Sequence, residues 1–320
     1  MNSPLRLSLA LLLLGGLAAG CGKNAGAPLA PSSGASGSSS GSANDQAEIS
    51  QAMAGAPELV EDGQYESPDQ TRIDGPAGAA AAINPLYFFR NITSVERQFE
   101  FAFADTDSTG RPTTALVTMH KYLRGTFNIA TGPRAEGVRD SARLLVVRKP
   151  LADHWVRHLL LKRIPLATAS DPAGALARPR WRIAASSGVE VTSRAATTRI
   201  VSLEIKTAAR DTVIDDPLAL FRLRRVMKFD AGEEITLIVT TARNDDVVVL
   251  VRAGLRGRFR NNGDNTYTLV WHAPSRAGLF HVGVNALSNG TLFDDQAPYD
   301  SKAWIVPSVV SPTVLAEYVP

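Results

Sequence analysis

Apolar and polar residues alternate through most of the chain from Ile83 onward. Phe99-Glu100-Phe101-Ala102-Phe103 places large apolar residues at every second position, and residues 114–122 repeat the pattern after a turn at residues 105–110. A period of two residues is typical of a strand with one buried face. Many short segments of this kind, separated by Pro and Gly clusters, predict an all-β fold built as a sandwich or a barrel. We expect one β-rich domain over residues 83–228.

One stretch of this region predicts a helix. Asp216-Pro217-Leu218-Ala219-Leu220-Phe221-Arg222-Leu223 begins with a residue that can cap a helix, followed by proline at the first helical position.

The last hundred residues show the strand pattern more clearly. Segments of alternating or continuous apolar character are separated by turn residues, at 234–240, 246–252, 266–271, 279–286 and 302–307. We expect them to form a second β-sandwich domain over residues 229–320.

Part of this region resembles a known family. The series Asn262-Gly263-Asp264-Asn265-Thr266-Tyr267-Thr268, then Trp271-His272-Ala273-Pro274, then residues 277–284 is similar to filamin-type and related bacterial immunoglobulin-like repeats. The resemblance covers roughly residues 230–308 and implies an immunoglobulin-like sandwich. Because the chain has a single cysteine, a disulfide of the antibody type is excluded.

The segment before Ile83 has no hydrophobic periodicity. Residues 31–42 are almost entirely Gly and Ser, a composition typical of a flexible coil. Residues 22–76 carry eight acidic residues against two basic ones, the acids being Asp45, Glu48, Glu58, Glu61, Asp62, Glu66, Asp69 and Asp74. We expect residues 21–82 to form a disordered tether rich in Gly, Ser, Ala and acids.

The first 20 residues have the layout of a secretory signal peptide. Arg6 gives a basic start, Leu7–Leu14 an apolar core, and Ala18-Ala19-Gly20 a small-residue exit before Cys21. The apolar run is shorter than the ~20 residues that span a bilayer. The end of this segment resembles the lipobox of bacterial lipoproteins, with Ala18 at a position that is usually Leu.

The lipobox resemblance implies that Cys21 becomes the lipidated N-terminus and anchors the chain in one leaflet of a membrane. Gly22 rather than Asp follows it, which implies an outer-membrane location, on the periplasmic face or the cell surface. With Cys21 lipidated, no cysteine is left for a disulfide or a thiolate site.

Basic residues are concentrated in the middle of the chain. Residues 134–225 carry 18 Lys or Arg against nine Asp or Glu, although the net charge of the whole chain is only +3. Such a surplus suits anionic partners, or it reflects arginines at outward positions of strands, which we favour. The exported location disfavours nucleic acid as a partner.

Two groups of residues suggest metal chemistry. Asp105-Thr106-Asp107-Ser108-Thr109-Gly110 begins like a calcium loop, which makes Asp105 and Asp107 candidate calcium ligands. Leu116 stands where such a loop needs a glutamate, and this favours a plain hairpin turn. His154 and His158 are four residues apart, but no third ligand for zinc is evident.

The sequence contains no arrangement that predicts catalysis. The Gly-x-Ser-x-Gly match at residues 37–41 lies in the Gly/Ser tract without a preceding strand, and no phosphate-binding loop motif occurs. We therefore expect no cofactor other than a candidate calcium ion. The expected function is a membrane-anchored envelope lipoprotein that acts as a non-catalytic binding or scaffold module for a protein or glycan. The alternative is a carbohydrate- or metal-dependent surface enzyme, or an enzyme accessory, with its site in the first β domain.

Overall fold

A computed structural model describes residues 42–73, 82–132, 145–164, 181–251 and 256–311. These residues lie within one compact unit and are mostly β-strand. The elements in chain order are α1 Ala43–Ala54, α2 Pro57–Val60, α3 Gly63–Glu66, β1 Thr71–Arg72, β2 Pro85–Thr106, β3 Pro112–Thr131, β4 Leu145–Arg163, β5 Trp181–Ser193, β6 Ile200–Lys206, β7 Asp211–Ile214, β8 Phe221–Arg222, the 3-10 turn Leu223–Arg225, β9 Met227–Asp230, β10 Glu234–Thr241, β11 Val247–Val251, β12 Arg260–Asn261, β13 Thr266–His272, β14 Gly278–Leu287, α4 Asn289–Phe293 and β15 Ser301–Ser311.

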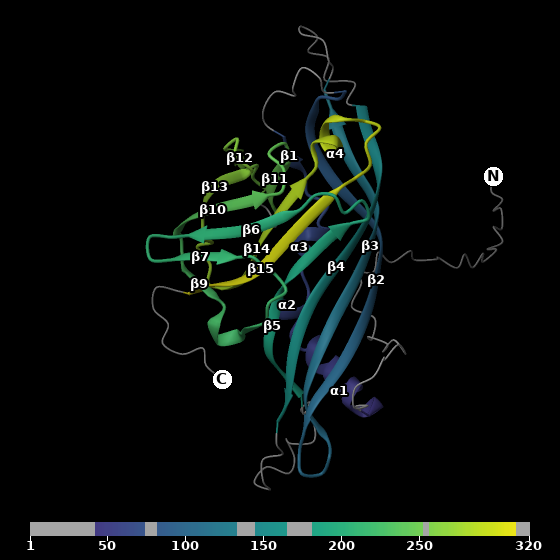
Figure 1. Cartoon of the computed structure of the whole chain (residues 1–320), viewed down its shortest axis with the longest axis vertical. Coiled ribbons are helices and arrows are strands. Elements are labelled where there is room, and N and C mark those ends of the chain that lie inside the picture. The colour runs from purple at the N-terminus through teal and green to yellow at the C-terminus, as the bar shows by residue number, and fades with distance from the viewer. Residues whose placement is uncertain (1–41, 74–81, 133–144, 165–180, 252–255, 312–320) are drawn as a thin grey trace, which may run out of the picture. The chain divides into compact units, whose positions relative to one another are not determined.

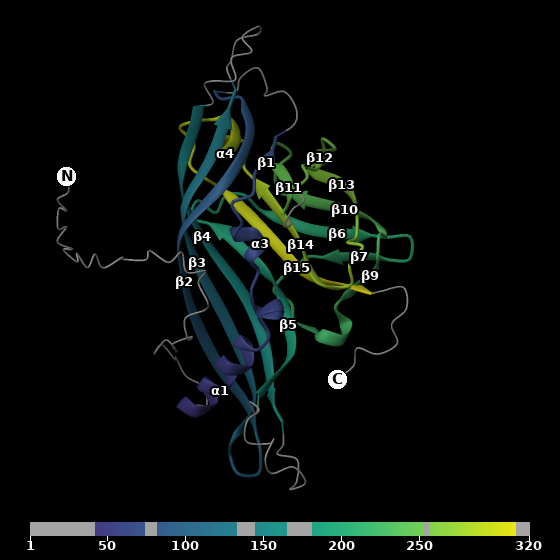
Figure 2. The same ribbon diagram turned by 180° about the vertical axis from the view of Figure 1, so that it is seen from behind.

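The larger sheet contains ten strands. Its main path runs β1-β2-β3-β4-β5-β15-β14-β11, while β8 pairs with β5 and β9 pairs in parallel with β15. Strands β2, β3 and β4 are 22, 20 and 19 residues long and form long antiparallel ladders. Figures 1 and 2 show these strands twisting and curling along their length, beyond the part of the sheet that β14 and β15 form.

The smaller sheet has the order β12-β13-β10-β6-β7 and packs face to face against β11, β14 and β15. The two sheets enclose one apolar core, which includes Leu203, Leu237, Tyr267, Val284 and Trp304. Strand β10 shows the alternation that the sequence predicts, with Ile235, Leu237, Val239 and Thr241 buried and the residues between them more exposed.

The prediction of a β-rich fold is confirmed, since the described residues are mostly strand with four short helices, but the prediction of two separate sandwiches is wrong. Strands β2–β5, which were expected to build a first sandwich, form one sheet with the C-terminal strands, because β5 pairs with β15. The C-terminal core also takes β6 from the other side of the expected boundary at residues 228/229, since Leu203 and Ile205 pair with β10. Hydrogen bonding in both sheets thus crosses that boundary.

Two local predictions also differ from the structure. The stretch 216–223 forms no α-helix: the carboxylate of Asp216 accepts a hydrogen bond from the backbone N–H of Leu218 in a turn, and β8 and a 3-10 turn follow. Residues 42–73 of the expected disordered tether are ordered in α1, α2, α3 and β1. Residues 21–41 and 74–81 of that tether lie outside the described residues.

A bulge in β2 decides which of its side chains face inward. The register with β3 shifts between Ile92 and Ser94, opposite Gly125. A Cβ atom on Gly125 would lie 2.0 Å from the carbonyl oxygen of Asn91, so the two backbones approach too closely for any other residue. The shift reverses the alternation of side chains along the strand. As a result Arg90 and Arg97, an even and an odd position, lie on the same face.

A buried carboxyl before β11 makes stability depend on pH. Burial raises the pKa of Asp246 to about 6 from an ordinary value of 3.8, although the hydroxyl of Thr241 opposes this. Because the folded-state pKa lies above the unfolded one, stability decreases as the pH rises through this window. We expect Asp246→Asn to raise the free energy of unfolding at pH 7 by about 1–3 kcal/mol and to change it little at pH 3.5.

Urea denaturation of both proteins between pH 3.5 and 7.5 checks this prediction. Asp245→Asn is the matched control, because the Asp245 carboxylate pairs with Arg243 at the surface and its pKa is lowered, first of all by the hydrogen bond from Arg243. A variant at Asp246 that is less stable than the parent at pH 7 would contradict the argument.

Candidate functional site: a cation-lined sheet face under an acidic strap

Residues 42–73, named here the N-terminal strap, lie along one face of the long strands (Figure 2). The strap starts at Ser42, whose side chain and backbone exchange hydrogen bonds with Asp45 in a capping box that begins α1. It ends where Thr71 and Arg72 pair with β2. Five apolar side chains of the strap are buried, those of Ile49, Met53, Val60, Tyr65 and Ile73.

The sheet face under the strap, named here the inner face, carries an unusual number of cations. They are Arg90 and Arg97 on β2, Lys121 on β3, and Arg157 and Arg163 on β4, together with Lys149 of β4. The ammonium of Lys149 is bound not by the strap but by the carbonyls of Gly290, Asp294 and Ala297 around α4. The register confirms that they share one face, since Lys121 lies opposite Arg97 on one side and Trp155 on the other. Arg90, Lys121, Lys149 and Arg157 are at most 3% exposed. Buried cations are rare unless they are paired.

Lys121 is the best-paired of these cations. Its ammonium lies 2.9 Å from Glu61 and 2.8 Å from Glu66, both in the strap, and 4.8 Å from the centre of the Trp155 ring. Burial alone raises the pKa of Glu61, but Lys121 and then Arg97 outweigh it, so that the pKa lies below its usual value. The strap thus supplies two carboxyl groups to a fully buried ammonium.

Arg157 lies next to this cluster and is also fully buried. Its guanidinium donates a hydrogen bond to the carbonyl oxygen of Leu59 and lies 5.2 Å from the Trp155 ring centre. Burial lowers the pKa of Arg157 to about 10, against the opposing effect of the carboxylates of Asp62 and Glu61. The strap therefore supplies this cation with one backbone carbonyl and neighbouring negative charge, while its Nε and Nη2 are buried without a hydrogen-bond partner.

A third contact is made at the start of the strap. Arg163 forms an ion pair with Asp45, and its guanidinium carbon lies 5.0 Å above the Trp181 ring. The indole N–H of Trp181 donates to the same carboxylate at 3.3 Å. The Trp181 ring thus supports the guanidinium of Arg163. The guanidinium and the indole N–H together bind the carboxylate of Asp45.

Nearer the C-terminal end of the strap, the sheet supplies a carboxyl group and the strap supplies the hydrogen-bond donor. Asp153 of the inner face is buried and accepts hydrogen bonds from the hydroxyls of Tyr65 at 2.8 Å and Tyr299 at 3.0 Å. Burial raises the pKa of Asp153, although Arg90 and the two tyrosines oppose this. Arg90 in turn lies 4.3 Å above the ring of Tyr65. Tyr65 therefore joins the strap to both charges.

On this buried face, charge-assisted hydrogen bonds and cation–π contacts hold the carboxylates of the chain's own strap. From the sequence, the basic residues within 134–225 were predicted to face outward from their strands. That was wrong for Lys149, Arg157 and Arg163, which have the same strand parity as Trp155, Leu159 and Leu161. The parity was the signal that could have revealed them.

The candidate calcium residues lie in the β2–β3 hairpin, away from the strap. The Asp107 carboxylate accepts hydrogen bonds from the Thr109 backbone and hydroxyl and from the Arg111 backbone. Asp105 accepts a hydrogen bond from the hydroxyl of Thr114. Within the described ranges no three His, Cys, Asp or Glu side chains lie close enough together to hold a metal ion. Calcium binding by Asp105 and Asp107 stays a prediction.

The histidines pair differently from the sequence hypothesis. Nδ1 of His120 on β3 lies 2.9 Å from Nε2 of His154 on β4, and Glu100 lies 3.5 Å from the other nitrogen of His120. Burial, and then the neighbouring His120, lower the pKa of His154. The ring of His158 contacts the carbonyl of Leu218 instead. The structure therefore brings His154 to His120 and not to His158.

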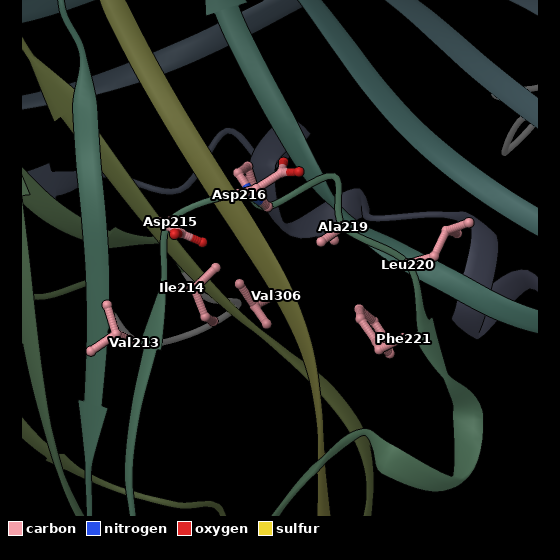
Figure 3. Close-up of a pocket in the computed structure, with 10 residues that line it drawn as sticks. Val213, Ile214, Asp215, Asp216, Ala219, Leu220, Phe221 and Val306 are labelled. Carbon is pink, nitrogen blue, oxygen red and sulfur yellow. The ribbon is translucent and has the colours of Figure 1, made fainter.

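A cavity of about 210 Å³ lies beside β7, β8 and β15 (Figure 3). Ile214, Phe221 and Val306 form its apolar wall, and Asp215 and Asp216 are its acidic residues. The lining side chains in the described part of the chain include no pair of nucleophile and base. The cavity therefore offers a small apolar surface rather than a reactive group.

Cys21, the predicted lipidation residue, lies outside the described residues. No helix within the described ranges is long and apolar enough to cross a bilayer. Comparisons with protein-family models, curated proteins and solved structures gave no match to this chain.

Proposed function

We propose that this protein is a lipid-anchored lipoprotein of the cell envelope that acts as a non-catalytic binding module. The observation that carries the binding function is Lys121, a fully buried ammonium held between two carboxylates of the strap. Together with Arg157 and Arg163 it makes the inner face a preformed receptor for negative charge on a rigid sheet. The Gly-x-Ser-x-Gly match at residues 37–41 stands in the Gly/Ser tract rather than after a strand pattern, and no phosphate-loop motif occurs, which favours binding over catalysis.

The anchor rests on the signal-like segment that ends in Cys21. Acyl chains on this residue attach the protein stably to a membrane, because each buried CH₂ contributes about 0.8 kcal/mol. The 20 residues from Gly22 to Gly41 then separate the anchor from the strap. Gly22 after the cysteine supports an outer-membrane location.

We also propose that the C-terminal sandwich is immunoglobulin-like. Support comes from the segment that resembles filamin-type repeats. Asn265 has a left-handed φ of 66° in the turn before β13, and Tyr267 and Trp271 of that strand point into the core. Asn tolerates this conformation better than most residues. The sandwich would act as the support from which the longer strands extend.

Replacing the anchor residue tests the first part of the proposal. We expect Cys21→Ser to move the protein from the membrane fraction to the soluble fraction of its native host or a Gram-negative host. The parent should yield an N-terminal peptide that begins at Cys21 and carries acyl mass. Ser33→Ala in the same segment is the control and should stay with the membrane. A parent peptide without acyl mass, or a Cys21→Ser protein that stays on the membrane, would refute lipid anchoring.

A further inference from the structure

The strap is attached to the sheet mainly through its side chains. Among the described residues, its main-chain hydrogen bonds to the sheet occur at its C-terminal end, where β1 pairs with β2 and the N–H of Ile73 donates to Leu86 at 2.9 Å. The helices α1 to α3 have their own internal hydrogen bonds and do not extend the sheet. Such a segment can leave without breaking a sheet ladder over most of its length.

The contacts along the strap occur in the same order as the cations along the sheet. Asp45 pairs with Arg163, the carbonyl of Leu59 with Arg157, and Glu61 and Glu66 with Lys121. Each cation belongs to the sheet and each acceptor to the strap. The sheet therefore carries a complete recognition surface of its own, with Trp155 and Trp181 beneath the cations.

We propose that the inner face is a receptor site for an acidic peptide segment of a partner protein, and that the strap is its resident occupant. A partner segment that carries carboxylates at a similar spacing, with apolar residues between them, displaces residues 42–70 and takes their place. This inference deepens the proposed binding function and rests on it, since it names the site and the chemistry of the partner.

Because the strap is covalently attached, it lowers the apparent affinity of the inner face for a partner segment. A short tether gives the strap an effective concentration of the order of millimolar. A free segment with the same intrinsic affinity must therefore compete with an occupant that is already present, and its apparent affinity falls in proportion. Only a partner with more carboxylates, or one held close to the same membrane, displaces the strap efficiently.

The experiment separates the strap from the sheet without removing it. A site for a specific protease is placed within residues 74–81 of the full chain carrying Cys21→Ser, and the purified protein is cut there. The probe is a synthetic fluorescein-labelled peptide of residues 42–73. We expect the cut protein to exchange its strap for the probe, and the uncut protein to bind the probe at least tenfold more weakly. Raising the salt concentration from 0.05 to 0.5 M should weaken probe binding severalfold, because salt screens the ion pairs of Asp45, Glu61 and Glu66 but not the apolar contacts of the strap.

Two matched changes test the role of charge. A probe with Asp45→Asn, Glu61→Gln and Glu66→Gln should bind the cut protein at least tenfold more weakly than the parent probe. A probe with Glu58→Gln is the control, because Glu58 is exposed and makes no ion pair among those described. On the protein side Lys121→Met should reduce the difference between the acidic and amidated probes, and the remaining difference reflects Arg163 with Asp45 and Arg97 with Glu61. If Lys121→Met does not fold, the salt dependence and the amidated probe still test whether negative charge on the segment is needed for binding to the inner face.

Three outcomes would overturn the inference. The first is a cut protein that does not exchange its strap with the probe. The second is equal binding of the acidic and amidated probes. The third is release of the probe by vesicles of anionic phospholipid at concentrations where an excess of unlabelled acidic peptide has no effect, which would assign the face to a lipid surface. Because all these measurements use the Cys21→Ser protein, their failure leaves the lipid anchor untouched, and loss of the anchor leaves them valid.

Discussion

Replacing Glu61 and Glu66 together with glutamine releases the strap while the sheets stay folded. Both substitutions remove the negative charge that faces Lys121, whose side chain is fully buried. An ammonium left in such a place without a charged partner is strongly destabilising, by about 3 kcal/mol. The molecule relieves this cost by letting the strap leave and water reach Lys121. We expect amide hydrogens in residues 57–70 to exchange roughly 100-fold faster, since 1.4 kcal/mol corresponds to a factor of ten.

Hydrogen exchange read by mass spectrometry checks this expectation, with limited proteolysis as a second measurement. Peptides from β10 and β13 in the C-terminal core should exchange at the parent rate. Glu58→Gln is the control, because it removes an exposed carboxylate from the same segment without touching Lys121. Unchanged protection of residues 57–70 in the double variant would show that the ion pairs do not hold the strap.

Replacing Asp300 with alanine lowers the stability of the whole molecule by about 3–5 kcal/mol. Its buried carboxylate accepts hydrogen bonds from the hydroxyls of Ser193 and Thr197 and from the backbone N–H groups of Thr197 and Thr198. Burial alone raises the pKa of Asp300, but these donors outweigh it and hold the pKa below its usual value. Alanine leaves several buried donors without an acceptor, and each such group costs about 1–3 kcal/mol.

Thermal denaturation measures this effect, and we expect the midpoint to fall by about 10 °C. Asp295→Ala is the matched control, because that carboxyl is exposed in the loop between α4 and β15. The stabilisation by Asp300 is also expected to depend on pH. Because the folded-state pKa of Asp300 is lowered, its stabilisation is present at neutral pH and is lost as the pH falls below its usual value of 3.8. The parent and the variant should therefore converge in stability towards acid, and an unchanged gap would contradict the assignment.

The sequence predicted the strands well because each strand carries its own signal. Alternation in β10 and β13 identified both strands and their buried residues. Alternation also held the information on the inner face, since Lys121 lies in step with Met119 and Leu123, which are buried. The charge of Lys121, taken alone, predicts solvent exposure, and this prediction conflicts with the alternation that places Lys121 on the buried face. A lysine or arginine in phase with apolar neighbours on a strand deserves to be treated as buried and paired.

The strap and the sheet connections could not be predicted in the same way. Apolar residues of the strap, such as Ile49, Val60 and Tyr65, are too far apart to form a periodic pattern. The surface that orders them comes from strands later in the chain, as Arg90 and Asp153 do for Tyr65. The join of β5 with β15 is also invisible locally, because Val191 and Ala303 are brought together by the fold alone. Both features depend on contacts between distant parts of the chain.

The order of contacts along the strap has a mechanical consequence. If Cys21 is fixed in a membrane, tension on the molecule enters the folded part at Ser42, where α1 begins. The pull reaches the pair of Asp45 with Arg163 first, then Leu59 with Arg157, and only afterwards the cluster at Lys121. Contacts loaded one after another yield at a lower force than contacts loaded together. The strap would therefore unzip in steps and lengthen the connection to the membrane, while both sheets remain intact under the same load.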